Sequence, residues 1–330
     1  MRTIPSSAFK FFLILEKKLR LITMCRGGTN SSAFKFKHMR YLDFSYSDLE
    51  AINAADSIHQ LYNLQTLNLH RSKNVRMIVN EDIGSLINLR HLNLSFSDVN
   101  LLPISIAHLQ NLSSLDISHN SAIPELPDSI SLLYNLTMLK LNSCSSLKAL
   151  PGNFGALTQL RSLDLFYTRI TELPESLTSN ICKLEYVNLG SWCNYPKEIK
   201  NWVELRHLEN HGKSKNSSMP GGIENLTRLE VLDPYIFRKE DYVSIDGCSF
   251  NSVTSFIREL ADINSLRRLV IVNLENVRGG KIEAERAKLK DKKNIQMLEL
   301  RWNYKEEEDE KYMRLEFEEE VEEEEEVRGR

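Results

Sequence analysis

Residues 61–69 read LYNLQTLNL, which places leucine at positions 61, 64, 67 and 69. The same frame returns at residues 86–94, 109–117, 133–141 and 157–165. Its second leucine stands at 64, 89, 112, 136, 160 and 184, so the steps are 25, 23, 24, 24 and 24 residues. The chain is therefore built of similar units that each pack on their neighbours.

Within each unit, two closely spaced apolar residues such as Leu67 and Leu69 are expected to point inward from a short strand. The residues between and beside them, Thr66, Asn68 and His70, then point outward, because strand side chains alternate. This consensus at a period of 20–29 residues is typical of leucine-rich repeats. We predict an α/β solenoid, a leucine-rich-repeat horseshoe with a parallel sheet on its concave face.

The segments opposite the strands have a pattern of their own. Leu-Pro pairs stand at 102–103, 126–127, 150–151 and 173–174, and an apolar residue follows three positions after each proline. Proline fixes φ and lacks a backbone donor, so it suits an extended segment outside a hydrogen-bonded ladder. We therefore predict mostly irregular or 3-10 outer segments.

A polar or small residue closes each turn three positions after the inner strand pair. It is Ser72, Ser97, Asn120, Cys144 and Thr168 in successive units, and its side chain can bond to the backbone. The seventh unit has Trp192 there, which cannot make this bond, so we expect a local distortion.

The repeats change in character along the chain. We divide it into an N-terminal segment 1–33, weakly ordered or capping, regular repeats 34–232, an insertion 233–256, further irregular repeats 257–304 and an acidic disordered tail 305–330. Residues 283–289 read as an outer-face helix. The tail holds 14 acidic and 5 basic side chains, whereas the rest of the chain holds 31 and 37. A surplus of six positive charges is mild for so long a body, and nothing in it indicates nucleic acid.

Cysteine usage and the N-terminus indicate the compartment. The five cysteines are scattered, and the apolar run from Phe11 to Leu15 is too short for a signal-peptide core or a membrane span. We interpret the cysteines as reduced structural thiols and expect a cytoplasmic protein without a membrane partner.

The later segments resemble plant nucleotide-binding leucine-rich-repeat disease-resistance proteins of the coiled-coil class. The resemblance rests on SMPGGIENLTRL at 218–229, IREL at 257–260 and LRRLVI at 266–271, and above all on LENV at 274–277, EAERAKL at 283–289 and LELRW at 298–302. KHMRYLDFS at 37–45 resembles the first coil of such arrays, so the match spans roughly residues 34–303. The chain has no G-x-x-x-x-G-K-[S/T], so no nucleotide site is expected.

In the resembled family, the repeats hold a nucleotide-binding switch inactive and recognise pathogen proteins or their targets. Outward strand positions and the turns after them would carry that role here, and aromatic side chains on a concave surface are typical of binding hot spots. The candidate protein-binding residues are Tyr41, Asp43, Tyr46, His91, Asn93, Phe96, Met138, Lys140, Asp164, Phe166, Tyr167 and Tyr186. These side chains could instead pack against neighbouring coils and bind nothing.

No catalytic or metal-binding constellation stands out. The eight histidines are spread over the coils, and no activated nucleophile is indicated, so we predict no enzyme activity and no cofactor. The sequence favours a recognition module in plant defence whose partner is a pathogen effector, a guarded host protein or a nucleotide-binding receptor domain. The alternatives are a general scaffold or adaptor without an immune role, or a truncated, non-functional receptor fragment.

Overall fold

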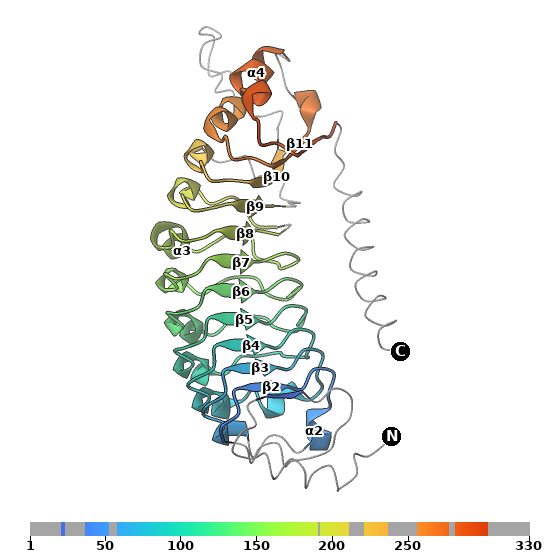
Figure 1. Cartoon of the computed structure of the whole chain (residues 1–330), viewed down its shortest axis with the longest axis vertical. Helices are drawn as coiled ribbons and strands as arrows, with labels where there is room; N and C mark the ends of the chain where they lie inside the picture. The colour runs from blue at the N-terminus through green and yellow to red at the C-terminus, as the bar shows by residue number, and fades with distance from the viewer. Residues whose placement is uncertain are drawn as a thin grey trace.

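The computed structural model describes residues 21–23, 37–52, 58–190, 192–210, 221–236, 256–276 and 281–302. They form a stack of coils in which the strands of successive repeats lie one above another (Figure 1). The strands make one twelve-stranded sheet in chain order, and every pair is parallel. They are β1 Leu21–Thr23, β2 Tyr41–Asp43, β3 Thr66–Asn68, β4 His91–Asn93, β5 Ser114–Asp116, β6 Met138–Lys140, β7 Ser162–Asp164, β8 Tyr186–Asn188, β9 His207–Glu209, β10 Val231–Ile236, β11 Arg268–Val272 and β12 Met297–Leu300. The predicted leucine-rich-repeat horseshoe is confirmed.

The strands align without register shifts from β2 to β9. Leu67 pairs with Leu92, Leu92 with Leu115, and Leu115 with Leu139, so the middle residue of each strand stacks on its equivalent. These four leucines are at most 1% exposed. Stacking identical side chains in line produces one continuous core along the array, as expected when single repeats cannot bury their apolar faces alone.

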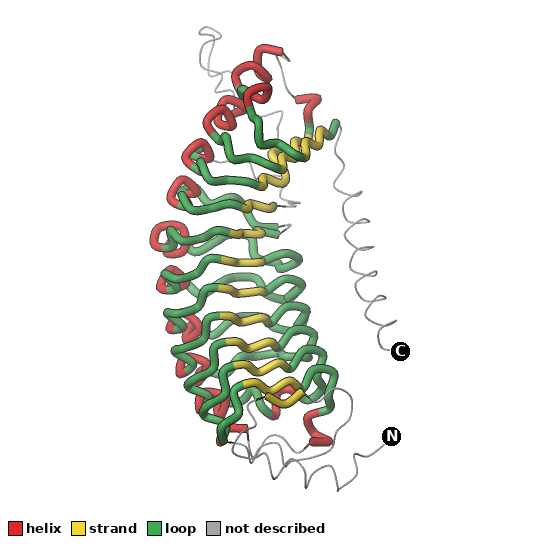
Figure 2. Tube along the Cα trace, in the orientation of Figure 1, coloured by secondary structure: helices red, strands yellow, loops and turns green. Residues whose placement is uncertain are grey.

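Short helical turns follow one side of the stack, opposite the strands (Figure 2). Most are 3-10 turns, as predicted, and only α2 Leu49–Ile52, α3 Glu175–Asn180 and α4 Lys281–Arg286 are α-helical among the described residues. The 3-10 turns are η2 Ile58–Gln60, η3 Val75–Met77, η4 Glu81–Ser85, η5 Ile104–His108, η6 Asp128–Leu132, η7 Phe154–Ala156, η8 Ile199–Asn201, η9 Ile223–Asn225, η11 Phe256–Asp262, η12 Leu274–Asn276 and η13 Leu289–Asp291. The predicted helix 283–289 is α4, which begins at Lys281 and is followed by η13.

Proline explains where several of these turns begin. Pro103, Pro127 and Pro174 each stand immediately before a helical segment, in extended backbone. The apolar residue three positions later, such as Ile106 or Ile130, is fully buried. The Leu-Pro pattern thus ends the extended segment and starts a turn that closes the core on the convex side.

Side-chain bonds between coils hold the stack together at two points of each turn. Ser72 Oγ donates to the Phe44 carbonyl at 2.6 Å, and Cys144 Sγ donates to that of Ile117 at 3.2 Å. On the other flank, Asn111 Nδ2 donates to the Ile87 carbonyl at 2.9 Å, and Asn135 Nδ2 donates to that of Gln110 at 2.7 Å. The polar turn residues therefore make the predicted backbone bonds, and Asn111 and Asn135 link neighbouring coils on the other flank.

The repeat is irregular where the sequence predicted a distortion. Cys193 is buried and Trp192 is 46% exposed, so the buried turn position falls one residue later than in the other coils. Asn210 is fully buried and bonds to the Cys193 carbonyl at 3.3 Å. β10 continues through Ile236, so residues 233–236 belong to a repeat and not to the insertion to which the sequence assigned them. Most of the insertion, the tail and nearly all of segment 1–33 lie outside the described residues.

Candidate protein-binding face

The outward-facing residues of β2 to β9, at the first and third strand positions, form the concave face. In β3 to β7 a buried middle residue lies between two that are at least partly exposed, and in β2 and β8 the third residue is buried as well. Eight of the predicted binding residues lie on this face, and they are Tyr41, Asp43, His91, Asn93, Met138, Lys140, Asp164 and Tyr186. The sheet thus brings the predicted strand residues to one surface.

The third strand position has a structural role that the sequence interpretation missed. Asp43 accepts a hydrogen bond from the Ser45 amide at 2.9 Å, and Asn93 accepts one from the Ser95 amide at the same distance. Equivalent bonds are made by Asn68, Asp116, Asp164 and Asn188. Each is an Asx turn that closes the backbone after the strand. Asp43, Asn93 and Asp164 therefore close the turns after their strands, and their role in partner binding stays a prediction.

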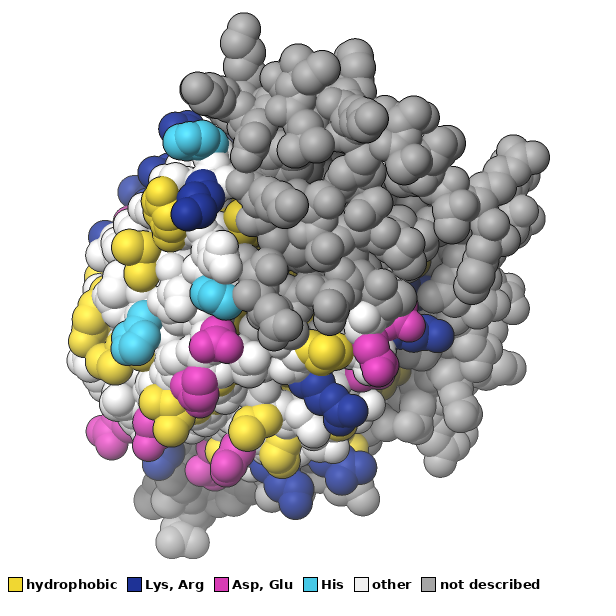
Figure 3. All heavy atoms as spheres, turned by 90° about the horizontal axis from the view of Figure 1, so that it is seen from below, with side chains coloured by type: hydrophobic (Ala, Val, Ile, Leu, Met, Phe, Trp, Pro, Cys, Tyr) yellow, Lys and Arg dark blue, Asp and Glu magenta, His cyan; other side chains and the backbone are white. Residues whose placement is uncertain are grey.

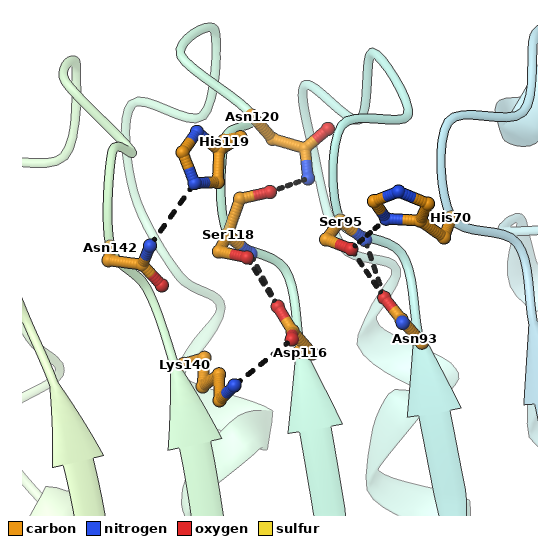
Figure 4. A network of polar contacts seen from close by, with 9 residues as sticks. All are labelled: His70, Asn93, Ser95, Asp116, Ser118, His119, Asn120, Lys140 and Asn142. Carbon is orange, nitrogen blue, oxygen red and sulfur yellow. Dashed lines mark hydrogen bonds and ion pairs between the residues drawn. The ribbon is translucent and has the colours of Figure 1, made fainter. Parts of the chain in front are cut away.

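Lys140 departs from that column because an ammonium group cannot accept a hydrogen bond. Its Nζ lies 3.9 Å from the carboxylate of Asp116 on the neighbouring strand, and its side chain is 45% exposed (Figure 4). Its charge is consequently presented on the concave face and is not used to close its own turn.

The turns after the strands hold a second column of side chains. Tyr46, Phe96 and Tyr167 occupy the equivalent position that the sequence indicated, with φ of 61°, 56° and 55°. Arg71 and His119 share it, with φ of 51° and 58°. This left-handed backbone is unusual for residues other than glycine, asparagine or aspartate. All five side chains remain partly exposed beside the sheet.

Four of these residues, together with His70, form an aromatic ladder, a name used below for Tyr46, His70, Arg71, Phe96 and His119. The Tyr46 and His70 rings meet edge to face at 5.4 Å, and His70 meets Phe96 at 5.5 Å. Phe96 stacks on His119 with ring centroids 3.8 Å apart, and the Arg71 guanidinium lies 4.4 Å from the Phe96 centroid. The side chains of the ladder therefore pack against neighbouring coils, as the alternative interpretation of the sequence allowed, and they remain partly exposed.

His70, Arg71 and His119 were not among the predicted residues. The signal that could have found them is positional, since Arg71 and His119 hold the same turn position as Tyr46 and Phe96, and His70 stands directly before it, where the neighbouring coils have Ser45 and Ser95. The sequence analysis selected conventional aromatic residues there and passed over the cation and the imidazoles that complete the column. Of the predicted turn residues, Phe166 and Tyr167 lie apart from the ladder and contact each other edge to face at 4.5 Å.

Hydrogen bonds fix the histidines of the ladder. His70 Nδ1 lies 2.7 Å from Ser95 Oγ, which donates to Asn93, and His119 Nε2 lies 3.2 Å from Asn142 Nδ2 (Figure 4). Burial, together with the nearby Arg71 and His70, lowers the pKa of His119 from 6.5 to about 4 against the opposing effect of the Asp116 carboxylate. His119 is therefore neutral at pH 7 and stacks on Phe96 as an uncharged ring.

The opposite end of the concave face is rich in carboxylates. Burial raises the pKa of Asp164 from 3.8 to about 6, and the negative charge of Glu209 adds to this effect. Glu209 also accepts hydrogen bonds from the Tyr186 hydroxyl at 3.3 Å and from Asn188 Nδ2 at 3.1 Å. The predicted residue Tyr186 is thus held in place by a neighbouring coil. The aromatic ladder thus lies beside β2 to β5, whereas Asp164, Tyr186 and Glu209 form a hydrogen-bonded and acidic group at β7 to β9.

Chemically, this arrangement suits contact with another surface. Figure 3 looks along the stack from below and shows apolar, basic, acidic and histidine side chains interspersed on the described surface at that end. Within the described ranges, no group of three or more His, Cys, Asp or Glu residues could hold a metal ion. No described helix has the length and apolar character needed to cross a membrane.

Sequence comparisons agree with the repeat architecture. The family model described as "Leucine-rich repeat region" matches residues 50–149, and the one described as "R13L1/DRL21 LRRs" matches residues 257–328. The chain therefore contains leucine-rich-repeat domains. A curated relative, the adenylate cyclase of Schizosaccharomyces pombe, is 39% identical over 85 residues, which are 26% of this chain and 5% of that protein. The chain thus matches only a small part of this relative's length.

Solved structures share the fold at low identity. A leucine-rich-repeat protein of Leptospira interrogans has a TM-score of 0.58 at 23% identity, covering 91% of this chain and 81% of that chain. An internalin of Listeria monocytogenes has 0.56 at 17% identity, covering 86% and 83%. A TDR receptor has 0.60 at 18% identity, covering 90% and 49%. These neighbours share the leucine-rich-repeat solenoid fold with the chain.

Proposed function

We propose that this chain is a cytoplasmic protein-recognition module of plant defence, corresponding to the repeat region of a nucleotide-binding leucine-rich-repeat receptor. Two likenesses support the proposal at the same place. The landmarks at 274–302 resemble the coiled-coil class of these receptors, and the R13L1/DRL21 family model matches residues 257–328. The partner is a pathogen effector, a guarded host protein or a nucleotide-binding receptor domain.

The aromatic ladder is the observation that carries the binding role. Binding hot spots are enriched in aromatic residues and arginine, and the ladder places Tyr46, Arg71 and Phe96 in one contiguous, partly exposed column. Ring contacts and left-handed turns already hold these side chains in place. Little side-chain freedom is then lost on binding, which lowers the entropic cost of association.

A capture experiment with the full chain tests both parts of the proposal. The immobilised wild type is compared with Arg71→Gln/Phe96→Asn, because asparagine tolerates the left-handed backbone that Phe96 adopts. Ile104→Gln is the matched surface control, since Ile104 is 71% exposed on the convex side. Proteins retained from plant extract are quantified by mass spectrometry.

We expect a protein that is retained by the wild type and by Ile104→Gln but lost from the double variant. Its identity as a receptor nucleotide-binding domain, a pathogen protein or a defence target would support the immune role. Equal retention by all three chains would exclude the ladder as the binding surface. A ladder-dependent partner with no connection to defence would instead favour a general scaffold.

A further inference from the structure

A cleft of about 510 Å³ opens beside the loops that follow β6, β7 and β8, and it is lined by Lys148, Arg169, Thr171 and Trp192. None of these residues belongs to the concave face or the aromatic ladder. Its volume falls in the range of small-ligand sites, which is enough for one large side chain and its neighbours. The cleft is thus a surface feature separate from the site described above.

The repeat itself explains why the cleft lies here. Lys148 and Thr171 each follow a fully buried residue, Leu147 and Ile170, and are exposed on adjacent coils. In the next coil Cys193 occupies the buried turn position, and the side chain of the residue before it, Trp192, therefore lies at the surface. Backbone bonds from Arg169 to Leu147 and from Asn194 to Thr171, at 2.8 and 2.9 Å, hold the three loops together.

The lining combines positive charge, a hydroxyl and an indole. Lys148 and Arg169 are both exposed, and neither makes an ion pair or side-chain hydrogen bond with another described residue. Arginine and lysine suit phosphate and carboxylate groups, with arginine able to form two parallel bonds. An indole face offers apolar contact to a ring or an aliphatic stem.

From this combination, we propose that the cleft binds one anionic side chain of a protein partner. Its charged group lies between Lys148 and Arg169, Thr171 supplies a hydroxyl to that group, and the apolar part of the side chain packs on Trp192. The charged group is a phosphate or a carboxylate. Phosphotyrosine and glutamate are the two sources that share this chemistry.

Three peptides test the proposal on the full chain. Each is acetylated and amidated Gly-Gly-X-Gly-Gly, with phosphotyrosine, glutamate or tyrosine as X, and binding is followed by tryptophan fluorescence. Trp192→Phe identifies the signal of the cleft among the three tryptophans, because Trp202 is fully buried and the exposed Trp302 does not line the cleft. Arg169→Gln and Lys148→Gln remove one cation each, and Arg76→Gln removes an exposed cation from η3 as the matched control. Circular dichroism verifies that every variant is folded.

We expect at least one anionic peptide to bind roughly tenfold more tightly than the tyrosine peptide, and each cleft variant to weaken it by about tenfold. Arg76→Gln leaves the affinity unchanged. Higher affinity for the phosphotyrosine peptide would identify the partner's side chain as a phosphorylated tyrosine. Equally tight or tighter binding of the glutamate peptide would identify it as a carboxylate in an acidic segment. Equal binding of all three peptides, or unchanged affinity in Arg169→Gln, overturns the proposal. The immune role is untouched by either result, because the cleft and the ladder share no residue.

Discussion

Asn120 bonds through its side chain both to the preceding coil and within its own turn, and its replacement by alanine is a sharp test of how the solenoid is held together. The side chain is 2% exposed. Its Nδ2 donates to the Leu94 and Ile117 carbonyls at 2.8 and 2.9 Å, and its Oδ1 accepts the amides of Ser97 and Val99 at 3.1 and 2.9 Å. Asn120→Ala removes all of these bonds at once.

The cost follows from the groups left behind. The two amides would be buried without a partner, and each such donor costs about 1–3 kcal/mol. Water entering the small space offsets part of this, so we expect a loss of about 3 kcal/mol in the free energy of unfolding. Ser97→Ala is the matched control, because the Ser97 hydroxyl donates only to carbonyls, and its removal should cost about 1 kcal/mol.

Urea denaturation followed by circular dichroism measures the loss, and hydrogen exchange locates it. The Ser97 and Val99 amides should exchange faster in Asn120→Ala, while amides between β7 and β8 keep their protection, because repeats contact only their neighbours. A loss no larger than that of Ser97→Ala would refute the reasoning. So would exchange that accelerates evenly along the array.

Further predictions concern packing, titration and thiol reactivity. Gly155→Ala should lower the melting temperature, because a Cβ there overlaps a backbone carbonyl of the next coil, whereas Gly152→Ala meets open space and should have little effect. Asp164 has a raised pKa of about 6 in the folded chain, so its contribution to stability is present below its ordinary pKa of 3.8 and is lost as the pH rises through 6. The wild type should therefore lose unfolding free energy between pH 4 and 6 in urea denaturation, and Asp164→Asn should not show this loss. His119 has a lowered folded pKa of about 4, so its contribution is present above 6.5 and lost as pH falls towards 4, and His119→Gln should abolish that loss in the same assay. Iodoacetamide at pH 8 should label exposed Cys182 in the native chain, and mass spectrometry should find the other described thiols labelled only after unfolding, because both are buried.

The fold was predictable because the repeat encodes it redundantly. Each leucine frame specifies an inward pair, and the same frame recurs through six regular coils, so errors in one repeat do not change the architecture. The Leu-Pro pattern likewise predicted the extended segments before η5, η6 and α3. Even the failure of the turn at Trp192 was visible, since tryptophan cannot replace a small hydrogen-bonding side chain in a buried turn.

The binding face was harder to predict, for a physical reason. Alternation along a strand says that Asp43 and Asp164 point outward, but it does not say whether their carboxylates are free for a partner. The structure shows both bonded to the amide two residues on. Conversely, His70 and Arg71 belong to the candidate site because they contact the Phe96 ring of a neighbouring coil. Such contacts depend on left-handed turn geometry, which the leucine pattern does not specify.

A rule for reading such a surface follows from these two observations. Where a residue conforms to the repeat, the repeat uses its polar groups, as the Asx turns and the buried turn residues show. Where a residue departs from the repeat, its chemistry becomes available to a partner. Lys140 interrupts the column of Asx turns and presents a charge, and Trp192 interrupts the buried turn column and presents an indole. Both departures fall within the coils of β6 to β8, so in this part of the array two side chains do not take the structural role that the repeat gives to their equivalents.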